Sequence, residues 1–290
     1  MKVLITGANG QVGHELQAYA KENGINCVSF PRVELDITDL SSVRSRLENS
    51  DVDFIINAAA YTAVDAAEEN VDDAYSVNRD GVKHLATICA EKDIPLLHIS
   101  TDFVFDGNKT EPYHESDKTN PLSVYGESKL AGEEVLRETW KKHIILRTAW
   151  VYGEHGGNFV KTMLRLMQER DELKVVGDQW GCPTSAASIA KALMQVAAKI
   201  YHGKEDFGTY HFSGSGRTNW CDFAREIQRQ ASEIIPINVS IKPIGSADWV
   251  SPATRPLNSV LSCEKIQTNF DIPSEQWQDQ LRPVIAALVS

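Results

Sequence analysis

A tyrosine and a lysine four residues apart, Tyr125 and Lys129, are the residues of this chain best suited to acid–base chemistry. If their segment is helical, side chains at this spacing lie on the same face. A lysine ammonium beside a phenol favours the phenolate, and so lowers the pKa of the tyrosine from about 10. Thr101, about two dozen residues earlier, adds a hydroxyl that can hold a substrate oxygen. An exposed helical pair without chemistry has the same spacing, so the interpretation depends on other segments.

A glycine-rich turn follows the first apolar segment of the chain. Residues 3–5 are typical of a buried parallel strand, and the residues after the turn show the apolar spacing of a helix. Glycines at such a turn let the backbone approach a pyrophosphate, and the free N–H groups at the helix start favour its charge. Glycine-rich turns without a nucleotide also exist. The predicted phosphate-binding residues are Gly7, Gly10, Gln11, Val12 and Gly13.

Strands and helices are expected to alternate along the first half of the chain. Apolar runs predict strands at residues 27–30, 53–58, 96–100 and 144–148. Helical patterns lie between them, at residues 40–49, 71–92 and 122–141. This alternation predicts an α/β fold of the Rossmann-like, doubly wound type, with a parallel sheet covered by helices on both faces.

Beyond residue 150 the alternation loosens, which indicates a smaller α+β lobe. The expected elements are helices at 159–168, 185–201, 220–231 and 274–288, and a strand at 209–213. We therefore expect a dinucleotide-binding domain at residues 1–150, completed by about residues 184–202. Residues 151–183 and 203–290 would form the substrate-binding lobe, with ligands in the crevice at the strand ends.

Composition restricts the possible partners and the compartment. The net charge of −11 disfavours nonspecific nucleic-acid binding and binding to an anionic membrane surface. No signal segment is evident, and no apolar stretch approaches the roughly 20 residues of a membrane span. Five scattered cysteines without C-x-x-C spacing indicate reduced thiols rather than disulfides or a zinc site. We expect a cytoplasmic protein with neither a nucleic-acid nor a membrane partner.

Four motifs occur in the order and spacing of one superfamily. They are Thr6-Gly7-x-x-Gly10-x-x-Gly13, Asn57-Ala58-Ala59-Ala60, Ser100-Thr101-Asp102 and Tyr125-x-x-x-Lys129. In these motifs the chain resembles the extended short-chain dehydrogenase/reductases. Within that superfamily it is most similar to the dTDP-4-dehydrorhamnose reductases. The stretches that carry this narrower resemblance are residues 35–39, 58–65, 100–107, 146–153, 178–184 and 255–259.

The resemblance implies NADPH-dependent reduction of the 4-keto group of dTDP-4-dehydro-L-rhamnose to dTDP-L-rhamnose, the last step of dTDP-rhamnose biosynthesis. Tyr125 would protonate the alkoxide, Lys129 would lower its pKa and hold the nicotinamide ribose, and Thr101 would hydrogen-bond the reacting oxygen. The other implied cofactor residues are Asp36, Ile37, Ala58, Ala59 and Ala60. The implied nucleotide-sugar residues are Thr62, Val64, Thr101, Phe103, Trp150, Asn158, Gln179 and Arg255.

Several of these residues have plainer interpretations. Trp150 suits a core aromatic beside a strand as well as a substrate contact, and Arg255 suits either a diphosphate contact or a solvent-exposed loop. His98 and His211 lie inside apolar runs and are interpreted as core imidazoles. The acid-rich residues 65–73 are interpreted as a solvated helix face.

The choice of cofactor depends on the end of the second strand. NAD-specific sites usually place an acid there for the ribose 2′-hydroxyl, whereas an arginine accommodates a 2′-phosphate. Residues 27–30 run into Pro31 and Arg32 without an acid. Arg32 therefore favours NADPH, with NADH possible, although a plain surface charge would explain it too.

Magnesium and oligomeric state stay open. Some members of the family use magnesium at a dimer interface through surface glutamates. Glu15 fits one such position, but Ala187 stands where a second glutamate is expected. No carboxylate spacing predicts a metal site of another kind. The chain is expected to be a monomer or a homodimer.

Two alternative functions are weighed against the reductase. Another nucleotide-sugar reductase or epimerase of the superfamily would share the motifs. Dehydratases of this group place an acid pair after the threonine, whereas Phe103 follows Asp102 here. A non-catalytic, NADP-binding regulatory subunit is the second alternative. It is disfavoured because such a subunit need not retain Thr101, Tyr125 and Lys129.

Overall fold

A six-stranded parallel sheet forms the centre of the computed structural model, which describes residues 1–48 and 50–289. In sheet order the strands are β10 (Gly208–His211), β5 (His143–Thr148), β4 (Leu96–Thr101), β3 (Phe54–Asn57), β1 (Lys2–Thr6) and β2 (Asn26–Phe30). The chain runs from β1 outward to β2 and then returns to β3 on the other side of β1. A crevice for ligands is therefore expected at the carboxyl ends of β1 and β3.

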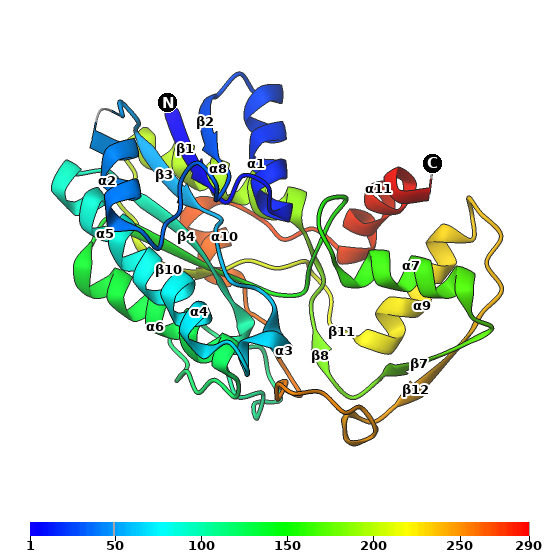
Figure 1. Cartoon of the computed structure of the whole chain (residues 1–290). Coiled ribbons are helices and arrows are strands. Elements are labelled where there is room, and N and C mark those ends of the chain that lie inside the picture. The colour runs from blue at the N-terminus through cyan, green and yellow to red at the C-terminus, as the bar shows by residue number, and fades with distance from the viewer. Residues whose placement is uncertain (49, 290) are drawn as a thin grey trace.

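Helices cover both faces of this sheet, which confirms the predicted doubly wound α/β fold (Figure 1). Alternate residues of β1 point to opposite faces. Val3 and Ile5 share a core with α1 (Gln11–Glu22) and α8 (Ala186–Tyr201). Leu4 lies in the opposite core. The helices of that second face are α2 (Leu40–Glu48), α5 (Gly81–Lys92) and α6 (Val124–Thr139).

The predicted helix at residues 71–92 is continuous but not uniform. It consists of α4 (Val71–Tyr75), a π-helical turn η1 (Ser76–Asp80) and α5. The π turn carries the buried Asn78, whose amide bonds both backbone polar groups of Tyr61. Asn78 Nδ2 also donates to Ser128 Oγ of α6 at 3.0 Å. The irregular turn therefore connects two segments near the crevice, as π turns at functional sites often do.

A second core lies beside the sheet, built from residues after 150, where we expected a smaller lobe (Figure 1). Phe223, Ile227 and Leu281 are among its fully buried side chains. Its main elements are α7 (Phe159–Glu169), α9 (Trp220–Ala231), α11 (Trp277–Val289) and the parallel pair β7 (Glu172–Val176) and β12 (Ser240–Ile244). Short elements complete the chain: α3 (Val64–Ala67), η2 (Asp102–Val104), β6 (Val151–Tyr152), β8 (Trp180–Gly181), β9 (Thr184–Ser185), β11 (Thr218–Asn219), η3 (Ser246–Asp248) and α10 (Glu264–Phe270).

Part of the predicted second lobe belongs to the first core. We expected residues 203–290 in the lobe, but β10 pairs with β5 as the edge strand of the central sheet. Ile266 and Phe270 of α10 pack in the same core as Val3. The apolar face of β10 needs cover, and α10 supplies it. Residue 49, the expected end of the helix at 40–49, lies outside the described residues.

In the described part of the chain, no helix is both long and apolar enough to cross a membrane.

Candidate active site

The glycine turn after β1 has no room for side chains at two of its positions. A Cβ at Gly7, which has a φ of 68°, would lie 2.6 Å from the Ala59 backbone nitrogen. A Cβ at Gly13 would lie 2.2 Å from the Gly7 carbonyl oxygen. The turn therefore packs directly against the loop after β3, and α1 packs directly against the turn. The N-terminus of α1 faces the crevice, in the geometry that suits a pyrophosphate.

A cavity of about 550 Å³ occupies this crevice. It brings together residues from the start of α1, the loop after β3, β4 and α6 that the sequence placed in one site. Predicted cofactor residues on its wall are Gly10, Gln11, Val12, Ala58, Ala59, Ala60, Tyr125 and Lys129. Predicted substrate residues on its wall are Thr62, Val64, Thr101, Phe103, Trp150 and Arg255. Asp102, Thr148, Trp220, Gly156 and Gly157 also line it, although they were not predicted.

Helix α6 carries Tyr125 and Lys129 one turn apart. Ser123 caps the helix by accepting a hydrogen bond from the Gly126 N–H at 3.3 Å, which fixes where the first turn begins. Lys129 is buried, and its Nζ donates to the Ile99 carbonyl oxygen at 2.7 Å. Burial lowers the pKa of Lys129 to about 8 because the charged ammonium loses hydration.

Tyr125 differs from the expectation in its acidity. Burial raises the pKa of Tyr125 to about 12, and a hydrogen bond with Thr101 opposes part of that rise. Among the described residues, Lys129 does not contribute to the shift. The predicted lowering of the phenol pKa by the lysine is therefore not found in the protein alone. The phenol is a neutral proton donor here.

Thr101, at the end of β4, is hydrogen-bonded to its neighbour in the chain. Its Oγ1 accepts the Phe103 N–H at 3.2 Å and donates to Asp102 Oδ1 at 3.0 Å. Asp102 is buried, and burial raises its pKa to about 6. Within the described residues its Oδ2 has no hydrogen-bond partner. Asp102 was not among the predicted site residues, but its place directly after Thr101 was a signal that it would reach the same wall.

A second, apolar cavity of about 620 Å³ adjoins the first, and Trp220 and Arg255 line both. Gln179, a predicted substrate residue, lines this second cavity and donates to Ser246 Oγ at 3.1 Å. The other walls are mostly apolar: Phe159, Met163, Leu166, Leu173, Val175, Val176 and Trp249.

Arg255 lies between the two cavities, and its guanidinium is paired with Asp65 at 2.8 Å. It is therefore not a solvent-exposed loop residue. Asp65 departs from the predicted solvated helix face, because it also accepts hydrogen bonds from Ser251 Oγ and the Ala253 N–H. These bonds lower the pKa of Asp65, with the Arg255 hydrogen bond as the largest cause.

Trp150 is a wall residue as well as part of an aromatic cluster. Its ring stacks on Trp220, with centroids 3.5 Å apart and planes 6° from parallel. Its backbone has a φ of 47°, which is uncommon for a bulky residue. Gly181 makes the ring position possible, since a Cβ there would lie 2.5 Å from Trp150 Cε2. Nothing in the local sequence indicated Trp220, which reaches the cavity through tertiary packing.

Comparison with known proteins identifies the family. The model of the RmlD substrate binding domain family matches residues 1–290. The dTDP-4-dehydrorhamnose reductase of Sinorhizobium fredii is 42% identical over 100% of this chain and 98% of its own length. The chain belongs to the dTDP-4-dehydrorhamnose reductase family. This confirms the resemblance seen in the motifs.

Other members of this reductase family agree in sequence and in structure. The dTDP-4-dehydrorhamnose reductase of Aggregatibacter actinomycetemcomitans is 44% identical over 98% of both chains. The crystal structure of the Clostridium acetobutylicum relative has a TM-score of 0.93, with 39% identity over 99% of both chains. The Bacillus anthracis relative, solved in complex with NADP, has a TM-score of 0.91, with 36% identity over 99% of both chains.

Five residues predicted for the cofactor do not line the cavity. Gly7 and Gly13 pack inside the glycine turn, and Arg32, Asp36 and Ile37 lie elsewhere. Arg32 is exposed and pairs with Asp36 at 3.2 Å. Burial would raise the pKa of Asp36, but hydrogen bonds from Thr38 and Arg32 lower it. The Ile37 side chain is buried in the core against Gly81, so it faces the protein interior.

Asn158, predicted on the nucleotide-sugar side, lies beside the phosphate turn. Its Nδ2 donates to Gln11 Oε1 at 3.0 Å and to the Gly153 carbonyl oxygen at 2.8 Å. Its Oδ1 caps α7 by accepting the Lys161 N–H. Asn158 thus ties the loop after β6 to the N-terminus of α1. Gly156 and Gly157 of that loop, rather than Asn158, line the cavity.

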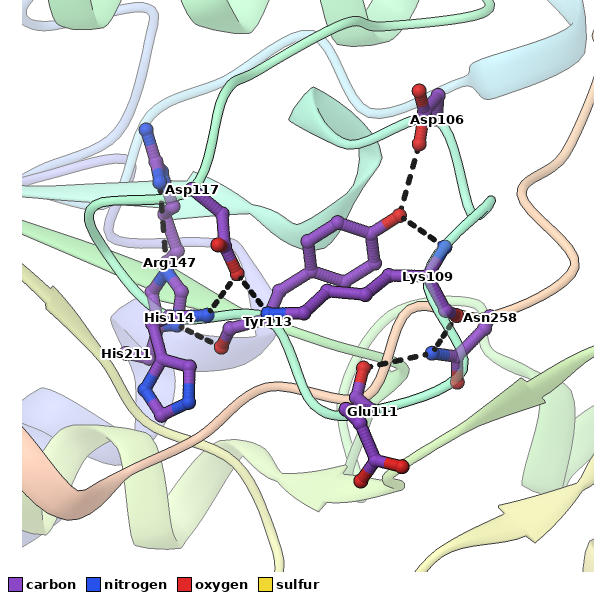
Figure 2. Close-up of polar contacts among 9 residues, drawn as sticks. All are labelled: Asp106, Lys109, Glu111, Tyr113, His114, Asp117, Arg147, His211 and Asn258. Carbon is purple, nitrogen blue, oxygen red and sulfur yellow. Dashed lines mark hydrogen bonds and ion pairs between the residues drawn. The ribbon is translucent and has the colours of Figure 1, made fainter.

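The loop that follows Asp102 is fixed to the segment that follows Arg255 (Figure 2). Tyr113 donates its O–H to Asp106 Oδ1 at 2.9 Å. Asn258 donates to the carbonyl oxygens of Lys109 and Glu111. The Asn258 bonds therefore join the loop after Asp102 to the segment after Arg255, and the Tyr113 bond closes the loop on itself.

The far end of the same loop is anchored to the central sheet (Figure 2). The Tyr113 carbonyl oxygen is bonded by His211 of β10, and His211 Nε2 lies 3.4 Å from Arg147 of β5. His211 is thus a core imidazole, as predicted from the sequence.

No group of three or more His, Cys, Asp or Glu side chains in residues 1–48 and 50–289 is placed to hold a metal ion. Glu15 is half-buried on α1, where burial and the nearby Glu154 raise its pKa. The prediction about magnesium therefore stays open.

Proposed function

We propose that this chain reduces the 4-keto group of dTDP-4-dehydro-L-rhamnose with NADPH, giving dTDP-L-rhamnose in the last step of dTDP-rhamnose biosynthesis. The observation that carries the proposal is the cavity wall itself. Thr101, Tyr125 and Lys129 share it with the glycine turn. The names of the relatives, at about 40% identity over the whole chain, support the substrate.

The glycine cradle and the adjoining wall fit a nicotinamide dinucleotide. Gln11 and Val12 present backbone N–H groups at the start of α1, where a pyrophosphate would be held, whereas the Gly10 N–H donates to the Gly7 carbonyl oxygen at 2.9 Å. Arg32 lies after β2, and its exposed guanidinium suits a ribose 2′-phosphate, so we propose NADPH as the preferred form. The NADP complex of the Bacillus anthracis relative supports this choice. NADPH supplies the hydride when bound.

The residues of the chain then supply the proton and the orientation. The Tyr125 phenol gives its proton to the oxygen of the reacting carbonyl, so that ketone, hydride and proton together give the alcohol. Thr101 holds that oxygen beside the phenol. Lys129, on the same face of α6, holds the ribose.

The second cavity suits the nucleotide part of the sugar donor. Its apolar walls would cover the thymine and deoxyribose, and Gln179 supplies an amide. Arg255, between the cavities, can form a bidentate pair with a diphosphate once Asp65 is displaced.

The test mixes purified protein, NADPH and dTDP-4-dehydrorhamnose, and follows the absorbance of the reduced cofactor. We expect oxidation of NADPH and formation of dTDP-L-rhamnose, with a slower reaction from NADH. Tight NADPH binding without oxidation would refute the reductase and favour the regulatory subunit. An isomeric keto sugar, formed with no net oxidation of the cofactor, would instead favour an epimerase.

A further inference from the structure

A buried chain of hydrogen bonds leads from β1 to Lys129. Thr6 Oγ1 donates to Asn57 Oδ1 at 2.6 Å, and Asn57 Nδ2 lies 3.0 Å from His98 Nδ1. The other ring nitrogen, His98 Nε2, lies 3.4 Å from Lys129 Nζ. All four side chains are buried. The proposed proton transfer at Tyr125 does not by itself require this series of hydrogen bonds.

The orientation of the Asn57 amide fixes which nitrogen of His98 carries a proton. Asn57 Oδ1 accepts from Thr6 Oγ1 and also from the Ala59 N–H at 3.1 Å. A backbone N–H can only donate, so oxygen must occupy that side of the amide and nitrogen must face His98. His98 Nδ1 is then an acceptor and carries no proton.

His98 is also neutral. Its side chain is fully buried, and burial, with Lys129 and His143 nearby, lowers its pKa well below the usual value. A neutral imidazole carries one proton, which must be on Nε2 because Nδ1 accepts. An N–H group therefore points at Lys129 Nζ.

We propose that His98 is a positioning residue for Lys129, whose neutral amine it favours over the ammonium by presenting an Nε2–H to the lysine nitrogen. An ammonium has only donors and cannot accept this N–H, whereas a neutral amine has a lone pair that can. Lys129 keeps its own bond to the Ile99 carbonyl oxygen in either form.

The other charged groups near Lys129 do not cancel this effect. Glu133, one turn further along α6, favours the ammonium. Its buried carboxylate is already shared by Arg147, at 2.9 and 2.7 Å, and by Arg137. Tyr125, on the same helix face, is neutral because burial raises its pKa.

The consequence concerns the return of the catalyst to its starting state, and it rests on the proposed function. After Tyr125 has given its proton away, the phenolate must be protonated again. A lysine with a pKa of about 8 gives up its proton far more readily than one at the ordinary 10.5. Burial causes that lowering, and the His98 N–H, by favouring the neutral amine, adds to the tendency of Lys129 to act as a proton source as well as a holding group.

The first experiment uses the unmodified protein. Nitrogen-15 NMR of the histidine side chains distinguishes a protonated from an unprotonated ring nitrogen. We expect His98 to carry its proton on Nε2 from pH 6 to 9. A proton on Nδ1, or a doubly protonated ring in that range, would overturn the proposal without any variant.

The second experiment measures the pKa of Lys129 by NMR of the lysine side chains, with its signal assigned by its loss in Lys129→Arg. His98→Asn retains an acceptor for Asn57 but removes the N–H, and His98→Gln offers Lys129 an amide oxygen. We expect the pKa of Lys129 to be higher in His98→Asn than in the unmodified protein, and higher again in His98→Gln, where the rise reaches about one pH unit. His211→Gln, at another buried imidazole, is the matched control and should leave it unchanged.

The pH profile of turnover provides the functional readout. We expect the alkaline limb of kcat to move upward in His98→Gln and to stay in place in His211→Gln. An unchanged Lys129 pKa in folded His98→Gln would refute the role of His98. If the NMR shifts occur but no sugar is reduced, His98 tunes the lysine and the proposed function is the part that fails.

Discussion

Tyr125 carries the proton-transfer step at the scale of single residues. Replacing it by phenylalanine removes one oxygen and leaves the ring packing intact. We expect Tyr125→Phe to lower kcat by about 10²- to 10⁴-fold, the usual contribution of a positioned acid, and to leave NADPH affinity nearly unchanged. Steady-state kinetics measures kcat, and cofactor titration measures the affinity for NADPH. Tyr19→Phe, on α1 away from the cavity wall, is the control; equal activity in both variants would contradict the role.

Asp102 makes stability depend on pH. Its pKa rises from the usual 3.8 to about 6 in the folded protein, so between these values the folded state binds more protons than the unfolded state. The free energy of unfolding therefore falls as pH rises through this window, by about 3 kcal/mol for this group. Asp102→Asn stays neutral and avoids that loss.

Urea unfolding of both proteins at pH 4 and at pH 7 tests this prediction. We expect Asp102→Asn to gain about 2–3 kcal/mol relative to the unmodified protein between the two pH values. A stability difference that is the same at both pH values would show that Asp102 ionises normally.

The site residues that were predictable from the sequence are those whose relative position is set by a short spacing along the chain. The glycine turn and the pair Tyr125 and Lys129 are each set by one turn of backbone, so their pattern is local. Asp65 and Arg255 are 190 residues apart, and their pairing depends on how the two cores meet. The tautomer of His98 is equally non-local, because Asn57 and Ala59 decide it.

Among the elements, α6 depends on its close approach to the π turn η1. A Cβ at Gly132 of α6 would lie 2.0 Å from the Asn78 carbonyl oxygen. Gly132→Ala must push the two segments apart, and we expect a loss of about 1–3 kcal/mol in the free energy of unfolding. Thermal or urea unfolding measures it.

Gly157→Ala is the matched control for that substitution, since nothing in the described chain lies within 4 Å of the added Cβ. Equal stability of the two variants would contradict the tight packing of α6 on η1. The helical pattern of residues 71–92 was predictable, but the π turn was not. Asn78 in that turn bonds Tyr61 and Ser128, which lie elsewhere in the chain and which no local pattern pairs with it.

At the scale of the whole molecule, Arg255 connects the two cavities. Arg255→Gln removes a charged donor from the proposed diphosphate position. We expect KM for the nucleotide sugar to rise about 10- to 100-fold, with a much smaller change in kcat, because the lost bonds are made equally in ground and transition states.

Arg165→Gln is the control for that substitution, because it breaks an exposed ion pair with Glu169 on α7 instead. It should leave both constants within about twofold. An unchanged KM in Arg255→Gln would place the diphosphate elsewhere.

The fold class was predictable because strand and helix periodicities are local, and the parallel sheet follows from their alternation. The division of the chain between the large sheet and the smaller lobe was less predictable from the sequence. Residues 208–211 look the same in sequence whether they join the large sheet or a small one, and the pairing with β5 decides.

That pairing has a consequence for protein synthesis. The first core includes Ile266 and Phe270, although its first strand begins at residue 2. On the ribosome, the nascent sheet must therefore wait for residues 208–211 before its edge is paired and for residues 264–270 before its α10 cover is in place. The smaller lobe is translated in the meantime, between β5 and the end of the chain. Emergence of residues 264–289, rather than of an N-terminal half, is the moment at which this molecule can complete the first core and the core of the smaller lobe.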